Sequence, residues 1–186
     1  MTGDFKITHE HMKALGPCVS GWRDFLSEYP KEQYPEGVGY QDILDRCCEK
    51  GRVDYAYWLL SKVGPTTDTR VYEEAIDDGN KYIVFAGSIN FKASVVCKSI
   101  EAGRGIEAGE GIKAGEGIKA GWGIEAGEGI EAGWGIKAGW GIKAGFRIFA
   151  GISLYRDSKN CEKYIRCKKL ISGEVAYGDL EITQEE

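Results

Sequence analysis

Two kinds of side chain in this sequence are of a type that could do chemistry, the histidines and the cysteines. His9 and His11 stand in one short segment, His-Glu-His, and imidazole is a common metal ligand and general base near neutral pH. Either role needs partner residues that the sequence does not supply, so we expect a solvated helix start. The six cysteines form no Cys-x-x-Cys pair, and Cys47 adjoins Cys48, which fits neither a zinc site nor a redox motif. We expect them to be reduced and mostly buried.

The glycine-rich part of the chain also lacks a catalytic signature. Gly-Trp-Gly-Ile-Glu-Ala-Gly has the spacing Gly-x-Gly-x-x-x-Gly, which differs from a dinucleotide fingerprint, and it recurs without a following helix. The sequence contains no nucleophile elbow or phosphate loop. Glutamates of the repeat alternate with lysines, as in a structural ladder. The sequence therefore predicts a protein that is not an enzyme and that uses no cofactor and no metal.

Composition and charge limit the class of partner. The chain has 186 residues, 42% of them hydrophobic, and a net charge of −5, with 9 basic and 15 acidic side chains in residues 1–80. No basic stripe favours direct nucleic-acid binding. The longest apolar stretches, such as Tyr82–Ala86, are too short to cross a membrane, and the N-terminus lacks the pattern of a signal peptide. We expect a cytoplasmic protein whose partner is another protein.

Residues 1–80 have a helical pattern and are predicted to form a small helical module. Thr8 is placed to cap a first helix that ends near Leu15, and Pro17 suits the first turn of a second helix that Pro30 stops. Further helices are predicted over 40–50 and 54–63, and a last helical turn or two over 69–77. The acidic side chains of the third helix, Asp42, Asp45 and Glu49, form a candidate surface for a partner.

From residue 81 the pattern changes to a hexapeptide repeat. The phrase Ile-x-Ala-Gly-x-Gly recurs eight times, from Ile100 to Phe146. A period of six does not match a helix, and two glycines in each hexad would cost a helix about 2 kcal/mol. A short strand with Ile and Ala inward, followed by a glycine turn, does fit. Such units bury a core only by stacking, so residues 81–154 are predicted to form a β-solenoid.

The charged letters of the hexads suggest the size of one coil. In coils of two hexads, Glu125 would lie beside Lys113 and Lys137, and every neighbouring pair along the stack would have opposite charge. In coils of three hexads, Glu107 would stack on Glu125 and Lys119 on Lys137. We therefore predict a flat solenoid of about 12 residues per coil in place of a triangular one.

This coil size also sorts the corner letters between the two glycines of each hexad. One edge would hold Trp122, Trp134 and Phe146, and the other Trp140. Exposed aromatic side chains are common anchors of protein interfaces, so these four residues are candidate partner-binding residues. The alternative is that they pack on the helical module or on the C-terminal tail.

Residues 155–186 are predicted to add strands that cap the solenoid and a frayed end. The fold class is therefore α+β: a helical module (1–80), a hexapeptide-repeat β-solenoid (81–154) and a C-terminal strand cap with a tail (155–186). The sequence does not indicate an oligomeric state.

The repeat, with its flanking "FAGSI", "CKSIEAG", "RIFAG" and "SGEVAYGDL", resembles a group of uncharacterised phage and prophage proteins. The segment "CVSGWRDFLSEYP…DYAYWLLS" is similar to a helical module at the front of other prophage repeat proteins. The resemblance implies a phage setting inside a bacterial host cell, where small binders often inhibit host defence, as anti-CRISPR proteins do.

Two functions remain open on this basis. The first is a non-enzymatic inhibitor that binds the surface of a host defence protein or complex. The second is a structural spacer or assembly protein of a phage particle, in which the repeat is a rigid rod.

Overall fold

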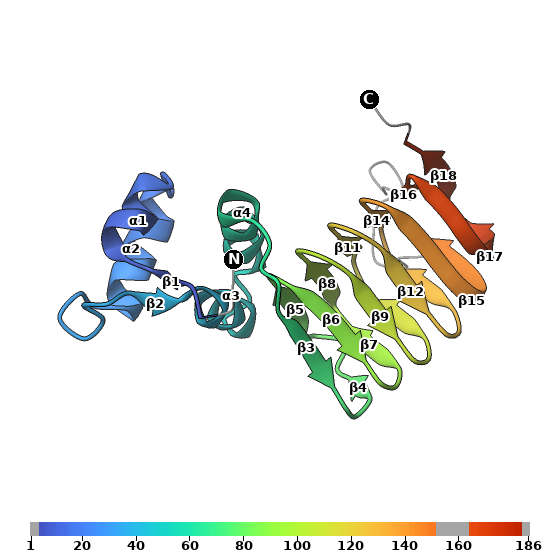
Figure 1. Ribbon diagram of the computed structural model, residues 1–186, viewed down its shortest axis with the longest axis horizontal. Helices are drawn as coiled ribbons and strands as arrows, with labels where there is room; N and C mark the ends of the chain where they lie inside the picture. The colour runs from blue at the N-terminus through green and yellow to red at the C-terminus, as the bar shows by residue number, and fades with distance from the viewer. Residues whose placement is uncertain (1–3, 152–163, 184–186) are drawn as a thin grey trace.

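The computed structural model describes residues 4–151 and 164–183. Helices stand at one end of an elongated molecule, and a β-solenoid extends from them to the C-terminus (Figure 1). The predicted α+β class, with a helical module followed by a β-solenoid and C-terminal strands, is confirmed.

Four helices form the N-terminal module: α1 (His9–Ala14), α2 (Val19–Glu28), α3 (Tyr40–Glu49) and α4 (Val53–Val63). The Thr8 hydroxyl caps α1 by accepting from the His11 N–H at 3.1 Å, as predicted. In α2 the cap is the Cys18 thiol, which accepts from the Gly21 N–H at 3.3 Å. A short antiparallel pair, β1 (Lys6–Ile7) and β2 (Val38–Gly39), ties the chain before α1 to the chain before α3.

The solenoid has three faces, each a stack of parallel strands. Face 1 holds β3 (Thr69–Tyr72), β6 (Ser88–Phe91), β9 (Ile106–Ala108), β12 (Ile124–Ala126) and the first half of β15 (Gly141–Ala150). Face 2 holds β4 (Ile76–Asp77), β7 (Val95–Cys97), β10 (Ile112–Ala114), β13 (Ile130–Ala132) and the second half of β15. Face 3 holds β5 (Tyr82–Phe85), β8 (Ser99–Ala102), β11 (Ile118–Ala120), β14 (Ile136–Ala138), β16 (Tyr164–Cys167) and β18 (Asp179–Ile182). The long strand β17 (Lys169–Tyr177) pairs with both halves of β15.

One coil contains three hexads, so the predicted coil of about 12 residues is wrong. Within the hexad repeat each strand pairs with the strand 18 residues further on, and Ile112 lies beside Ile130. Glu125 therefore lies beside Glu107 and Lys143, and not beside Lys113 or Lys137. The corner residues of the hexads lie between the faces and are exposed or half-buried, so a Glu or Trp there does not hinder a triangular coil.

The relative strengths of core packing and surface charge explain this outcome. The isoleucine and alanine of every hexad are almost fully buried in one core shared by the three faces. Burying one isoleucine contributes about 1.5–3 kcal/mol, whereas an exposed ion pair contributes about 0.2–1 kcal/mol. The ladder of three-hexad coils still forms ion pairs, at 2.9 Å for Lys113–Glu131 and 2.5 Å for Lys143–Glu125. It also accepts two like-charge contacts within the repeat, Glu107–Glu125 and Lys119–Lys137.

The charge reversal Lys137→Glu tests this register. Lys137 is exposed between Lys119 and Arg166, so a carboxylate there should raise the free energy of unfolding by about 0.5–1 kcal/mol. Lys113→Glu is the matched control and should lower it, because Lys113 is paired with Glu131. Urea unfolding of both variants gives the answer. Equal destabilisation is the result that coils of two hexads require, and it would contradict the three-hexad register.

The solenoid also begins earlier than the change in sequence pattern indicates. The helical turn predicted for residues 69–77 is wrong, because β3 and β4 lie there and pair with β6 and β7. The C-terminal strands β16, β17 and β18 are parallel to the strands below them and continue the solenoid.

A glutamine on α3 joins the helical module to the first coil. Among the described strands, β5 ends the face 3 stack, so one of its edges has no strand beside it. The Gln41 side-chain amide donates to the Val84 carbonyl at 2.9 Å and accepts from the Ala86 N–H at 2.9 Å. Its amide group thus takes the place of the missing strand. Asp45 strengthens the junction through two bonds from Arg70, at 2.8 and 2.7 Å.

Replacing Gln41 by alanine should destabilise the protein, because Val84 and Ala86 are buried and their backbone groups would lose these partners. We expect a loss of about 2–4 kcal/mol in the free energy of unfolding. Glu49→Ala, on the exposed side of the same helix, should change it by less than about 0.5 kcal/mol. Similar unfolding midpoints for the two variants would show that Gln41 does not support the first coil.

Candidate functional site

The corner residues lie on three edges of the solenoid, and not on the two that the sequence predicts. Trp122 and Trp140 share the edge between faces 3 and 1, where the Trp140 N–H donates to the Trp122 carbonyl at 2.8 Å. Trp134 lies on the edge between faces 2 and 3, and Phe146 on the edge between faces 1 and 2. The four aromatic residues therefore do not form one ridge. The expected grouping of Trp122 with Trp134 and Phe146 is wrong because it followed from coils of two hexads.

Among the described residues, Trp122 and Trp140 are the most exposed pair of aromatic side chains that lie on one edge in successive coils. Trp122 is 57% exposed and Trp140 is 55% exposed. Arg104, one coil before Trp122, places its guanidinium 4.6 Å from a Trp122 ring centroid, and the Lys168 ammonium lies 5.6 Å from that of Trp140. We call these four residues, Arg104, Trp122, Trp140 and Lys168, the Trp corner. The cation–π contacts hold the rings in place at the surface.

At the Trp corner, the first glycine after the hexad alanine is what lets successive coils stack closely. A Cβ on Gly121 would lie 2.1 Å from the carbonyl oxygen of Gly103, one coil earlier, and a Cβ on Gly139 would lie 2.0 Å from that of Gly121. Backbone therefore packs directly on backbone below Trp122 and Trp140. This close approach fixes the spacing of the two rings.

The other two aromatic candidates lie in different surroundings. Trp134 is half-buried, and the Tyr164 ring covers the neighbouring Gly135, where an added Cβ would lie 2.9 Å from it. Phe146 is 66% exposed in the corner that holds Glu110 and Glu128 in the preceding coils. Neither has a second exposed aromatic side chain beside it on its own edge among the described residues.

A groove of about 510 Å³ runs along face 1 beside the Trp corner. Trp122 and Trp140 border it on one side. The outward side chains of face 1 also line it: Asn90, Glu107, Glu125 and Lys143. Three glycines without side chains, Gly105, Gly123 and Gly141, lie between these two sets, and Thr69 and Ile171 lie at the first and last coils.

The charges in this groove are unevenly neutralised. Glu125 is paired with Lys143 at 2.5 Å. Glu107 lies beside Glu125 in the neighbouring strand, and its carboxylate accepts one hydrogen bond of 3.3 Å from the Asn90 side chain. The groove thus combines two exposed indole rings with one carboxylate that has no cation beside it among the described residues. Such a surface can bind a partner.

The acidic candidates of the helical module do not form one free surface. Asp45 is bound by Arg70 and Gln41 at the junction with the solenoid. Glu49 is paired with Arg46 at 3.1 Å, and Asp42 is exposed in the first turn of α3. Of these three carboxylates, Asp42 alone has no ion pair with another residue that the structure describes, which weakens the case for this surface.

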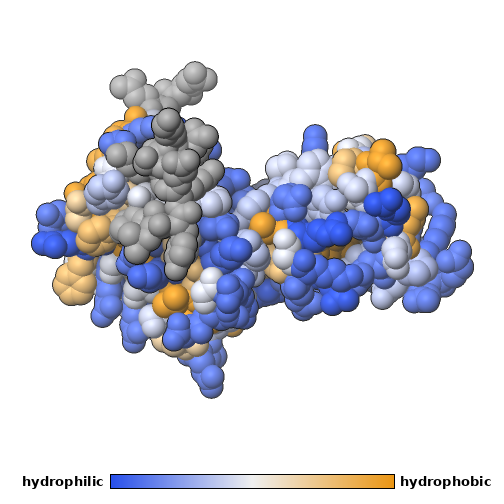
Figure 2. Space-filling view, turned by 180° about the vertical axis from the view of Figure 1, so that it is seen from behind, coloured by the Kyte–Doolittle hydropathy of each residue, from blue (hydrophilic) through white to orange (hydrophobic). Residues whose placement is uncertain are grey.

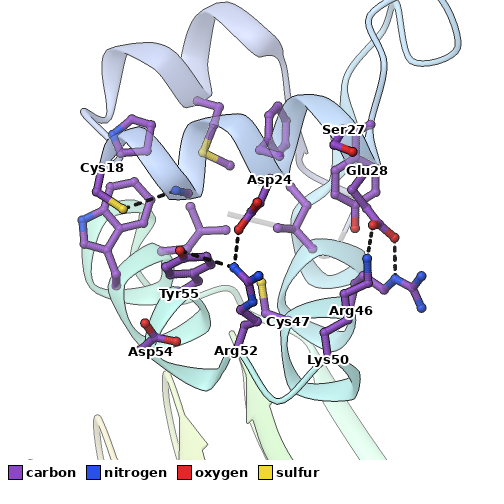
Figure 3. A pocket seen from close by; sticks show the side chains of 18 residues that line it. Cys18, Asp24, Ser27, Glu28, Arg46, Cys47, Lys50, Arg52, Asp54 and Tyr55 are labelled. Carbon is purple, nitrogen blue, oxygen red and sulfur yellow. Dashed lines mark hydrogen bonds and ion pairs between the residues drawn. The ribbon is translucent and has the colours of Figure 1, made fainter.

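A second cavity, of about 400 Å³, lies between the pair α1 and α2 and the pair α3 and α4. Apolar side chains such as Phe25, Ile43 and Leu59 line its interior. Ion pairs across the rim join the two helix pairs (Figure 3), with Arg52 on Asp24 and both Arg46 and Lys50 on Glu28. This cavity has no signal in the sequence, because it depends on how the two helix pairs meet.

Two cysteines border this cavity, and the pKa values of their thiols are shifted in opposite directions. Hydrogen bonds with the Ser20 hydroxyl and from the Gly21 backbone N–H lower the pKa of the exposed Cys18 thiol. Burial raises the pKa of Cys47 to about 11. The expectation of mostly buried cysteines fits Cys97 and Cys167 but not Cys18, and Cys161 lies outside the described residues.

The histidines have structural surroundings. His9 is buried, and its Nε2 lies 2.7 Å from the Tyr29 carbonyl, so the expected solvated position is wrong for this residue. His11 packs edge-on against the Phe5 ring. Among residues 4–151 and 164–183, no three His, Cys, Asp or Glu side chains gather as a metal site would require.

A comparison with known protein families, curated proteins and solved structures finds no match to this chain. Within the described ranges, the helices are all too short or too polar to span a membrane.

Proposed function

We propose that this chain is a non-enzymatic interaction protein that binds a partner protein through the Trp corner and the groove beside it. The observation that carries the proposal is the pair of half-exposed tryptophans, side by side on a stacked backbone and bordering a groove. Tryptophan is among the side chains that most often dominate binding energy at protein interfaces. Because the rings are already held by cation–π contacts, binding would cost little side-chain ordering.

The use that we propose for this surface is inhibition of a bacterial defence complex inside a host cell. The support for this setting is the resemblance of the repeat and of the helical segment to phage and prophage proteins. A rigid solenoid that presents anchors on one edge is suited to covering a surface of another protein.

One observation favours the alternative of a structural spacer. The last coil exposes four large apolar side chains, Ile171, Tyr177, Leu180 and Ile182. Hydrophobic atoms also appear over the C-terminal coils at the left of Figure 2, beyond a mostly hydrophilic middle. An exposed coil end offers backbone groups for strand pairing, which a rod built of several copies would use.

Affinity purification separates these two functions. The tagged chain is expressed in a bacterial host, with and without phage infection, beside a variant that carries Trp122→Glu and Trp140→Glu. An inhibitor should retain a host protein in a fixed ratio without infection, and the variant should lose it. Retention of phage particle proteins, or of further copies of this chain, by both forms would support the spacer and contradict the inhibitor.

A further inference from the structure

We infer that the groove on face 1 binds an extended segment of the partner that runs along the solenoid axis and places a lysine or arginine side chain on Glu107. This inference rests on the proposed function and adds the chemistry of the bound segment.

The dimensions of the groove suit an extended chain. Its lining comes from six successive coils, from Thr69 in the first to Ile171 in the last. Adjacent strands lie roughly 4.8 Å apart, so five steps span roughly 24 Å. An extended peptide advances about 3.3 Å per residue, so roughly seven residues would lie along this length.

The charges of the lining select a basic side chain at one place. Along face 1 the outward residues are, in order, Asn90, Glu107, Glu125 and Lys143. Lys143 neutralises Glu125, whereas Glu107 has the Asn90 amide on one side and a like charge on the other. A cation at Glu107 would relieve this repulsion, and a charge-assisted hydrogen bond is about twice as strong as a neutral one.

The Trp corner suits the rest of such a side chain. Arg104 and Lys168 already lie against the Trp122 and Trp140 rings, so the ring faces that they cover are not offered to a ligand cation. The exposed parts of the rings remain available to the methylene groups of a lysine or arginine, which pack on apolar surface while the charged end stays polar. The incoming charge is thereby directed to Glu107.

The glycines between these two sets keep the groove open. A Cβ on Gly123 would have its nearest neighbour 3.4 Å away and one on Gly105 at 3.7 Å, and neither residue has a positive φ. The fold therefore does not require glycine at these two positions. Gly123 lines the groove, so a methyl group there would take up space where the partner chain is to lie.

Fluorescence anisotropy with labelled heptapeptides and the full chain tests the inference. The probes are Ser-Gly-Ser-Lys-Ser-Gly-Ser and the same peptide with glutamate or methionine at the centre. The lysine peptide should bind at least about tenfold more tightly than the other two. Glu107→Gln should remove this preference, and Glu110→Gln, an equal charge change at the edge between faces 1 and 2, should not.

A pair of glycine variants supplies a control that leaves charge unchanged. Gly123→Ala should weaken the lysine peptide by about tenfold, because it fills the groove. Gly117→Ala has the same 3.4 Å clearance on the edge between faces 2 and 3 and should leave binding unchanged. Unaltered melting temperatures in both variants would show that the fold is intact.

Several results would overturn the inference. They are equal affinity for the three peptides, preference for the glutamate peptide, equal effects of the two glycine variants, and no binding of the lysine peptide at about 1 mM. If the Trp122→Glu and Trp140→Glu variant still loses its protein partner in that case, the proposed function stands and the basic segment alone is wrong.

Discussion

Gly121→Ala is expected to lower the free energy of unfolding by at least about 3 kcal/mol, whereas Gly123→Ala, two residues away, is expected to change it by less than about 1 kcal/mol. The Cβ of an alanine at 121 would lie 2.1 Å from the Gly103 carbonyl oxygen and 3.0 Å from its carbon. Both of these are backbone atoms of the preceding coil, so no side chain can move aside. The coils would have to separate locally and lose the hydrogen bond from the Gly121 N–H to Ala102.

Other glycines of the repeat differ in the same way. Gly127, Gly139 and Gly145 each have a carbonyl oxygen of the coil before them within 2.0–2.1 Å of an added Cβ, but at Gly115 the nearest atom is 3.9 Å away. Gly115→Ala should therefore be tolerated although its place in the hexad is that of Gly121. Urea unfolding of the three alanine variants at 115, 121 and 123 measures the contrast. Equal stabilities would show that the coils are not stacked as closely as described.

Replacing Trp122 and Trp140 together by glutamate is expected to weaken the partner complex by several kcal/mol, or more than about 100-fold in Kd. Both side chains are more than half exposed, and Glu110 and Glu128 already occupy the corresponding positions of another corner. The fold should therefore survive the change, with a loss of about 1–2 kcal/mol from the two cation–π contacts.

Phe146→Glu is the matched control for this double variant. Phe146 is 66% exposed but lies on the edge between faces 1 and 2, away from the groove. Surface plasmon resonance with the purified partner, together with thermal unfolding, separates binding from stability. If Phe146→Glu weakens the complex as much as the double variant does, the partner docks on another edge. If the double variant unfolds, the rings support the fold and are not free anchors.

The local fold follows closely from the sequence, but the coil size does not. Caps and stop signals such as Thr8 and Pro30 mark the helices, and the period of six marks the strands. Charge alternation favours coils of two hexads, yet it is a weak effect, and the isoleucines decide the coil size by filling a three-sided core. The first strands, over residues 69–77, lack the glycine pattern and are recognised only by their pairing with β6 and β7.

Of the candidate site, the sequence singled out Trp122 and Trp140 as possible binding residues but did not predict that they share an edge. Trp122 and Trp140 stand out in sequence as large side chains between glycines, but which aromatic residues share an edge depends on the coil size. Glu107 and Gln41 carry no such signal, because the role of each depends on the residues that pack beside it. Asp45 is the opposite case. The acidic residues of α3 made it a candidate for partner binding, yet Arg70 from β3 binds it within the chain.

The central claim is that the partner occupies the groove beside the Trp corner. Site-specific photo-crosslinking tests this claim most directly. Benzoylphenylalanine is placed at Asn90, which lines the groove, and in a second protein at Lys113, which is exposed on face 2. The account predicts a covalent adduct with the co-purifying partner from position 90 and none from position 113. An adduct from position 113 with none from position 90 would contradict it.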